Sequence, residues 1–304
     1  MSITIPKTIF GVVPPPNTLK YTSVERYVKR LADTYRDLEP DAMIIYDIQE
    51  EKGRNGKERP FPFRTRFSPL AFHDLLFKAL PEDAVLILYQ TLTVDKPLSD
   101  LSEYIQECRE KHHIQYLVWV GASKAISVMD ASRLTKRGCP EITIGGITIP
   151  ERHRDRHDED QRVLDKINSG IDFFTSQIVY NADNVITFLK DYWRMCQTYA
   201  ISPRTIVLAF APFGRQDTLE FMRWLGVEIA DGTANRVLSR DDVRQRIDES
   251  IEICLEIFTT VQAMCTRNNM DIPLGITVES VSKYKDEQKG ASTLFVLLKK
   301  ELSV

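Results

Sequence analysis

Six polar residues are the best candidates for chemistry, because each lies at or just after the end of a short apolar segment. They are Asp47, Glu50, Gln90, Thr93, Gln177 and Glu279. Carboxylates can accept hydrogen bonds or transfer a proton, whereas a carboxamide offers a donor and an acceptor side by side. Each residue alone is a weak signal, and its meaning depends on the elements that position it.

Gln177 carries the sharpest signal, because it follows Phe173 and Phe174 and directly precedes Ile178. A buried carboxamide in such surroundings must find a partner. Gln177 is therefore either a structural glutamine satisfied inside the fold or a residue that recognises the amide edge of a heterocycle. Glu279 has two readings as well, as a carboxylate in a ligand site or as the cap of a following helix.

Charge and composition exclude several classes of partner. The 304 residues are 43% hydrophobic, and 40 basic against 43 acidic residues give a net charge of −3. That balance predicts neither a nucleic-acid nor a membrane partner. The basic residues of segment 151–157 are interleaved with acids, which favours a solvated loop. No His, Cys or carboxylate set has metal-ligand spacing, so we expect no metal site.

The five cysteines indicate a reducing compartment, because their number is odd and no pair has a CxxC spacing. The N-terminal segment lacks the apolar core of a signal peptide. No stretch is apolar enough over about 18 residues to span a membrane. We therefore expect a cytoplasmic protein.

Eight short apolar segments alternate with longer amphipathic ones. The expected strands are residues 8–13, 42–46, 84–89, 116–120, 141–146, 172–175, 205–210 and 273–278. Helical periodicity covers residues 23–38, 98–110, 159–168, 181–199, 218–225 and 240–266, among others. The strand segments are continuously apolar instead of alternating, which is typical of parallel strands buried on both faces.

Eight strand–helix units predict an α/β fold, a (β/α)8 TIM barrel in a single domain over residues 1–304. A doubly wound open sheet is the alternative, weakened because no GxGxxG follows any strand. Active sites of such barrels form at the carboxyl ends of the strands, where the candidate residues lie. The long segment 49–68 after the second strand is either a lid or a disordered loop.

Three segments, in the same order along the chain, resemble motifs of the methylenetetrahydrofolate reductases. Residues 10–15, Phe-Gly-Val-Val-Pro-Pro, resemble that family's Phe-Glu-Phe-Phe-Pro-Pro. Residues 149–153, Ile-Pro-Glu-Arg-His, resemble its Tyr-Pro-Glu-x-His. Residues 166–177 resemble its Lys-x-x-x-Gly-Ala-Asp-x-x-x-Thr-Gln, and this piece is the strongest.

The resemblance implies a barrel in which NAD(P)H reduces FAD, and the flavin passes hydride to 5,10-methylenetetrahydrofolate to give 5-methyltetrahydrofolate. It implies that Gln177 contacts the folate pterin and that Gln90 and Glu279 belong to the substrate site. His153, Lys166 and Thr93 would lie near the flavin.

Departures from the family motifs put the flavin in question. Gly11 stands where the family has its presumed acid, a glutamate, and Ala122 stands where it has an aspartate. Thr91 replaces the histidine of its His-Leu-Thr. The pattern also resembles a divergent branch that works without flavin, in which hydride passes directly from the nicotinamide. Asp47 and Glu50 are then the candidate proton donors.

The expected function is NAD(P)H-dependent reduction of 5,10-methylenetetrahydrofolate in one-carbon metabolism, by an oxidoreductase acting on CH–NH donors. The sequence leaves FAD open and is compatible with a homo-oligomer. One alternative is a folate-binding barrel without reductase activity. Another is a barrel enzyme for a different substrate, because a fold does not fix a function.

Overall fold

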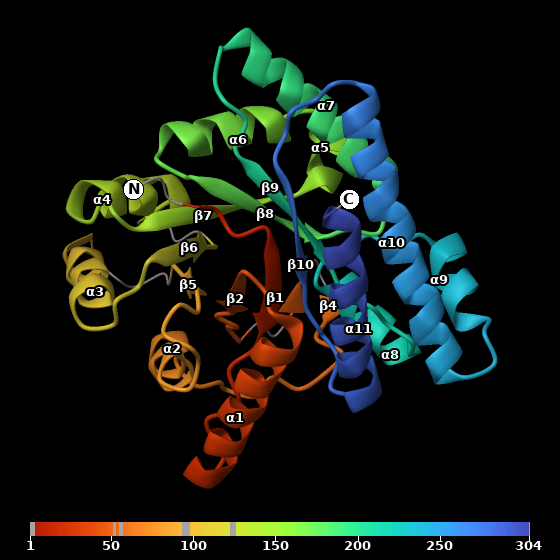
Figure 1. Cartoon of the computed structure of the whole chain (residues 1–304), viewed down its shortest axis with the longest axis horizontal. Coiled ribbons are helices and arrows are strands. Elements are labelled where there is room, and N and C mark those ends of the chain that lie inside the picture. The colour runs from red at the N-terminus through yellow and green to blue at the C-terminus, as the bar shows by residue number, and fades with distance from the viewer. Residues whose placement is uncertain (1–3, 51–52, 55–56, 93–97, 122–125, 304) are drawn as a thin grey trace. The chain divides into compact units, whose positions relative to one another are not determined.

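The computed structural model describes residues 4–50, 53–54, 57–92, 98–121 and 126–303. Its main sheet is a closed barrel with strand order β1-β10-β9-β8-β7-β6-β5-β2 (Figure 1). The strands are β1 (Thr8–Val12), β2 (Ala42–Ile45), β5 (Leu86–Thr91), β6 (Tyr116–Val120), β7 (Thr143–Thr148), β8 (Phe173–Ile178), β9 (Thr205–Phe210) and β10 (Leu274–Val278). The predicted (β/α)8 TIM barrel is confirmed, and the open sheet is wrong.

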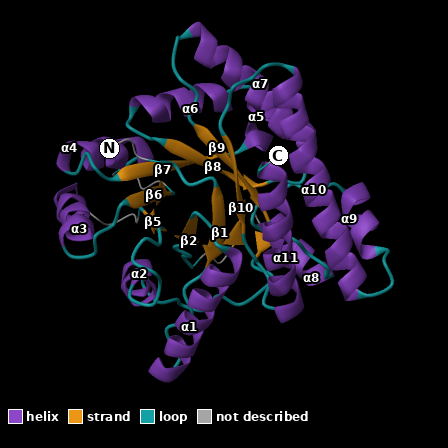
Figure 2. Ribbon diagram, viewed as in Figure 1, coloured by secondary structure: helices purple, strands orange, loops and turns teal. Residues whose placement is uncertain are grey.

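Helices alternate with these strands along the chain (Figure 2). They are α1 (Tyr21–Leu38), α2 (Pro69–Phe77), α3 (Leu98–Glu110), α4 (Val128–Gly138), α5 (Pro150–Arg156), α6 (Glu159–Asn168), α7 (Ala182–Thr198), α8 (Gln216–Trp224), α9 (Asp231–Leu238), α10 (Val243–Arg267) and α11 (Lys285–Leu302). The six helical segments predicted from periodicity are all present. No described helix has the length and apolarity that a membrane crossing requires.

Segment 151–157, predicted as a solvated loop, instead contains most of helix α5. Pro150 occupies the first helical turn, where a proline's missing N–H costs nothing. Glu151 and His153 are buried, and His153 lies with its Nε2 2.9 Å from Asp191 Oδ2 on α7. The prediction failed because the alternating charges of this segment lie on the exposed face of a helix. The other face of the helix is buried.

The long segment after β2 contains a short antiparallel pair, β3 (Gly53–Arg54) and β4 (Lys57–Glu58), that the sequence did not predict. Beyond it, the Arg59 guanidinium lies over the rings of Phe63, Phe221 and Trp224, at 4.9 Å from the Trp224 centroid. The described end of this segment therefore packs on α8. Its predicted role as a lid stays a prediction.

The chain divides into two compact units. One comprises Met1–Glu50, Arg64–Ile147 and Leu164–Phe174; the other comprises Glu51–Phe63, Thr148–Val163 and Thr175–Val304. We call them unit 1 and unit 2. All five cysteines are buried as free thiols.

Gly145 on β7 makes room for a large side chain inside unit 1. Trp119 donates a hydrogen bond from Nε1 to Thr135 on α4, so it faces the helices, and its neighbour Val118 faces the opposite way, into the barrel. Val118 is the register partner of Gly145. A Cβ added to Gly145 would lie 2.6 Å from the ring of Phe173 and 2.7 Å from Val118. Phe173 therefore occupies the space that a side chain at position 145 would need.

We predict that Gly145→Ala lowers the free energy of unfolding by about 1–3 kcal/mol, the usual cost of overpacking a filled core. Urea unfolding followed by circular dichroism measures it. Gly138→Ala is the matched control, because nothing lies within 4 Å of a Cβ at the end of α4. The control is expected to be neutral or stabilising by up to about 1 kcal/mol. Equal stability of the two variants would contradict this account of Gly145.

Candidate functional site

The inner face of β8, β9 and β10 carries a group of polar side chains in unit 2. Phe210 packs against Phe258 of α10, with ring centroids 6.3 Å apart, so Ala209 points to the inside of the barrel. Thr277 is the register partner of Ala209 and shares that face. On β8, alternation from Phe173 turns Thr175 and Gln177 inward as well. We call Thr175, Gln177 and Thr277 the inner polar patch.

Both threonines of the inner polar patch are deeply buried, at 2% exposure for Thr175 and 0% for Thr277. Neither hydroxyl has a hydrogen-bond partner within the described part of the chain. An unmade hydrogen bond in such a place costs about 1–3 kcal/mol. Groups of this kind are usually taken up by a ligand or by water. The sequence analysis missed both threonines, because a threonine in an apolar strand has no distinguishing pattern.

Gln177 is half-buried and held in one orientation by its own protein. Its Nε2 donates to the backbone oxygen of Leu225, the residue after α8, over 3.1 Å. Because a carbonyl can only accept, this bond fixes which end of the amide is the oxygen. The next residue, Gly226, has a φ of +92°, a conformation that favours glycine. The bond uses one of the two Nε2 hydrogens, so Oε1 and the second Nε2 hydrogen remain to be paired.

Glu279 directly follows β10, and its backbone N–H extends the strand ladder by donating to the oxygen of Phe210 over 3.0 Å. Its side chain is half-buried. The structure therefore places Glu279 at the carboxyl end of β10, in the same unit as Gln177.

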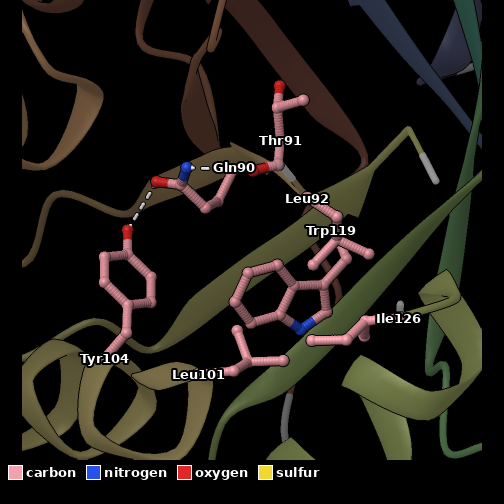
Figure 3. A pocket seen from close by; sticks show the side chains of 7 residues that line it. All are labelled: Gln90, Thr91, Leu92, Leu101, Tyr104, Trp119 and Ile126. Atoms are coloured by element: carbon pink, nitrogen blue, oxygen red, sulfur yellow. Dashed lines mark hydrogen bonds between the residues drawn. The ribbon is translucent and has the colours of Figure 1, made fainter. Parts of the chain in front are cut away.

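A second polar cluster lies in unit 1, at the carboxyl ends of β2 and β5. Asp47 accepts hydrogen bonds from Thr91 N over 2.8 Å, from Gln90 Nε2 over 3.2 Å and from Gln49 Nε2 over 2.6 Å. Gln90 Oε1 in turn accepts from the Tyr104 hydroxyl over 2.6 Å (Figure 3). Both ends of the Gln90 amide are therefore bound by protein, and three donors anchor the Asp47 carboxylate.

Beside this cluster lies a small pocket. Its lining residues, seen in Figure 3, are Gln90, Thr91, Leu92, Leu101, Tyr104, Trp119 and Ile126. Burial raises the pKa of Tyr104, so its phenol stays neutral and donates to Gln90.

The other predicted site residues lie in less revealing places. Glu50 is exposed, and Thr93 lies outside the described residues. His153 is 1% exposed, with Nε2 2.9 Å from Asp191 Oδ2 and Nδ1 3.6 Å from Asp160 Oδ1. Lys166 donates from Nζ to the backbone oxygen of Ile147. The roles predicted for these residues stay predictions.

The resemblance assigns His153 and Lys166 to FAD, and their contacts do not fit that group. A flavin-binding histidine or lysine must present a polar atom to the ribityl chain or the phosphates. Here the imidazole is enclosed by two aspartates, and the ammonium group is bonded to a backbone carbonyl. We therefore derive no chemistry through FAD.

Glu151 is a further residue that was not predicted from the sequence, although it stands in the Pro-Glu-x-His motif. It is 8% exposed, and neither carboxyl oxygen receives a hydrogen bond of normal geometry from the described residues. Burial raises the pKa of Glu151 from 4.5 to about 7. Its own backbone N–H and Arg154 oppose the rise in pKa, whereas Glu228 and Glu159 add to it. Glu151 thus carries its proton up to near-neutral pH.

Nearby Glu159 shows what a structural carboxylate looks like in the same unit. It is fully buried, and its Oε1 accepts from the Thr148 hydroxyl over 3.1 Å and from Ile149 N over 3.0 Å. Those donors tie β7 to the start of α6. Because burial outweighs the groups that favour the charged form of Glu151, that carboxyl weakens the fold. Titratable groups held at such a cost are concentrated in functional sites.

Comparison with known proteins identifies structural neighbours but no family. No family model and no curated protein matches the chain. An uncharacterized protein from Clostridium thermocellum, which binds two copies of 5-methyl-5,6,7,8-tetrahydrofolic acid, is 26% identical. Its TM-score is 0.82, over 97% of this chain and 96% of that one. Active domain 2 of a thermostable chitinase from Pyrococcus furiosus has a TM-score of 0.50 at 12% identity. The match covers 99% of this chain and 97% of that one. That second likeness shows the fold alone.

The raised pKa of Glu151 predicts a pH-dependent stability. Between 4.5, its value when unfolded, and about 7, its value when folded, only the unfolded chain loses this proton, so stability falls as pH rises through that window. The loss amounts to about 3 kcal/mol and is complete above about pH 7. Glu151→Gln removes the titrating group.

We therefore expect the unfolding free energy of Glu151→Gln, relative to wild type, to increase by about 3 kcal/mol between about pH 4.5 and pH 7.5. Urea unfolding across that range measures it. Glu252→Gln is the control, because Glu252 is an exposed carboxylate on α10. A difference in unfolding free energy between Glu151→Gln and wild type that stayed constant with pH would show that Glu151 titrates normally.

Proposed function

We propose that this protein binds a reduced folate of the 5-methyltetrahydrofolate type. The observation that carries the proposal is the likeness to the Clostridium thermocellum protein, which extends over nearly the whole of both chains at a TM-score of 0.82. That protein binds two copies of this compound. Agreement at 26% identity over that length, in a barrel that already resembles a folate-dependent family in sequence, supports the same class of ligand here.

The inner polar patch has the chemistry that a pterin requires. A reduced pterin contains a planar pyrimidinone ring whose edge carries N–H groups and a carbonyl oxygen. Gln177 offers an oriented acceptor, since its Nε2 is already bound to Leu225. The hydroxyls of Thr175 and Thr277 can each donate and accept. A pterin that binds at this face would satisfy polar groups that the described protein leaves unpaired.

The finer proposal is NAD(P)H-dependent reduction of 5,10-methylenetetrahydrofolate. The ligand of the Clostridium thermocellum protein, 5-methyltetrahydrofolate, is the product of that reaction, which supports a reductase. Because His153 and Lys166 do not fit FAD, we propose that hydride comes from the nicotinamide without a flavin. A folate-binding protein without reductase activity is the competing function, and Gly11 in place of the family's acid is the observation that favours it.

We predict that Gln177→Ala weakens binding of 5-methyltetrahydrofolate by about tenfold, equivalent to about 1.4 kcal/mol. The Oε1 acceptor is lost, and the Leu225 carbonyl loses its donor. Isothermal titration measures it. Gln197→Ala, an exposed glutamine in the last turn of α7, is the matched control and should bind like wild type. Unchanged affinity in a folded Gln177→Ala protein would make this glutamine purely structural.

A second prediction separates the reductase from the folate-binding protein. Purified protein should release little or no FAD on heat denaturation, and should oxidise NADH or NADPH only when 5,10-methylenetetrahydrofolate is present. Absorbance of the nicotinamide and of the heated supernatant measures both. Folate binding without nicotinamide oxidation would favour the competing function. Stoichiometric FAD would instead favour the family's flavin mechanism.

A further inference from the structure

Glu151 and Gln177 are linked by one short segment of unit 2, residues 225–228. Leu225 accepts the hydrogen bond from Gln177. Glu228, at the other end of the segment, is ion-paired with Arg154, and it lies close enough to Glu151 to raise its pKa. Glu151 also follows β7, and Gln177 is the second-last residue of β8, the next strand of the barrel. The carboxyl and the oriented amide therefore belong to one neighbourhood.

The two oxygens of Glu151 are uncommitted acceptors. Glu159 receives two hydrogen bonds, and Asp191 is paired with His153, whereas Glu151 receives none of normal geometry from the described residues. A carboxylate with two uncommitted oxygens matches two N–H groups that lie side by side. The aminopyrimidinone ring of a pterin presents such a pair, its ring N–H and its exocyclic amine.

We infer that Glu151 is a second pterin-recognition residue, whose two oxygens accept the adjacent ring N–H and amine of the bound folate, so that binding releases a proton from the protein. This inference rests on the proposed function and deepens it. Gln177 and Glu151 then divide the recognition, the amide accepting one hydrogen bond and the carboxylate accepting two.

The charges around Glu151 permit the carboxyl to lose its proton when the ligand binds. Arg154 favours the ionisation of Glu151, whereas Glu228 and Glu159 oppose it. Across from α5, Asp191 of α7 is held by His153, whose other nitrogen faces Asp160. A ligand must displace side chains to reach the buried oxygens. The Arg154–Glu228 pair is exposed enough to separate at little cost.

The sign of the pH dependence follows from the free protein. Below about pH 7 Glu151 holds its proton, which must leave before two N–H donors can bind. Affinity should therefore fall by about tenfold for each pH unit below about 7 and should level off above it. A carboxylate that instead bound as the neutral acid would give the opposite slope.

The test is isothermal titration with 5-methyltetrahydrofolate between about pH 5.5 and pH 8.5, in two buffers of different ionisation enthalpy. Wild type should release about one proton near pH 6 and almost none near pH 8.5. Glu151→Gln should lose this release and bind about tenfold more weakly at high pH, because its amide replaces one acceptor by a donor. Glu252→Gln, which changes an exposed glutamate of α10, is the control and should keep the release.

Proton release from the ligand or from a histidine would persist in Glu151→Gln. The difference in proton release between the two proteins therefore reports on this carboxyl alone. Equal proton release, or binding with none, would overturn the inference while the proposed function stands. Failure of the folded wild type to bind the compound at any pH would overturn both. Urea unfolding of Glu151→Gln confirms that the variant is folded.

Discussion

Closing eight parallel strands into a ring buries both faces of every strand, and most other features of this molecule depend on that constraint. The outward face meets helices, as Trp119 meets α4 and Phe210 meets α10. The inward face must be filled, and the Phe173 ring fills the space that the absent side chain of Gly145 leaves open. A polar side chain on the inward face therefore needs a partner inside the barrel. Thr175 and Thr277 are conspicuous because the described protein supplies none.

This constraint also explains why the fold could be predicted from the sequence. Strands buried on both faces are continuously apolar, and the eight apolar segments lie where β1, β2 and β5 to β10 were found. Helix α5 was missed because its exposed residues alternate in charge, and only contact with Asp191 on α7 reveals a buried His153. Pairing of β3 with β4 was missed for a related reason: a two-residue strand has no detectable periodicity.

The sequence predicted where the candidate site residues lie better than it predicted what their side chains do. Strand ends located Asp47, Gln90, Gln177 and Glu279. The sequence did not reveal that Asp47 and Gln90 satisfy each other, since their hydrogen bond joins residues 43 apart. Nor did it reveal which end of the Gln177 amide is free for a ligand, because that depends on the backbone of Leu225. Contacts between residues distant in sequence decide these roles.

The family motif has an acid at the position of Gly11, which has no side chain to donate a proton. The contacts in the structure draw attention to a different carboxyl, that of Glu151. Asp47 was a reasonable substitute by position, yet three donors hold it as an acceptor. Glu151 keeps its proton to near-neutral pH because burial disfavours its charge more than its backbone N–H and Arg154 favour it. The penalty of about 3 kcal/mol is a substantial fraction of a typical folding free energy of about 5–15 kcal/mol. A large barrel core can sustain that penalty, and a bound ligand with two N–H donors would remove it. The same carboxyl that destabilises the free protein would then favour the liganded one.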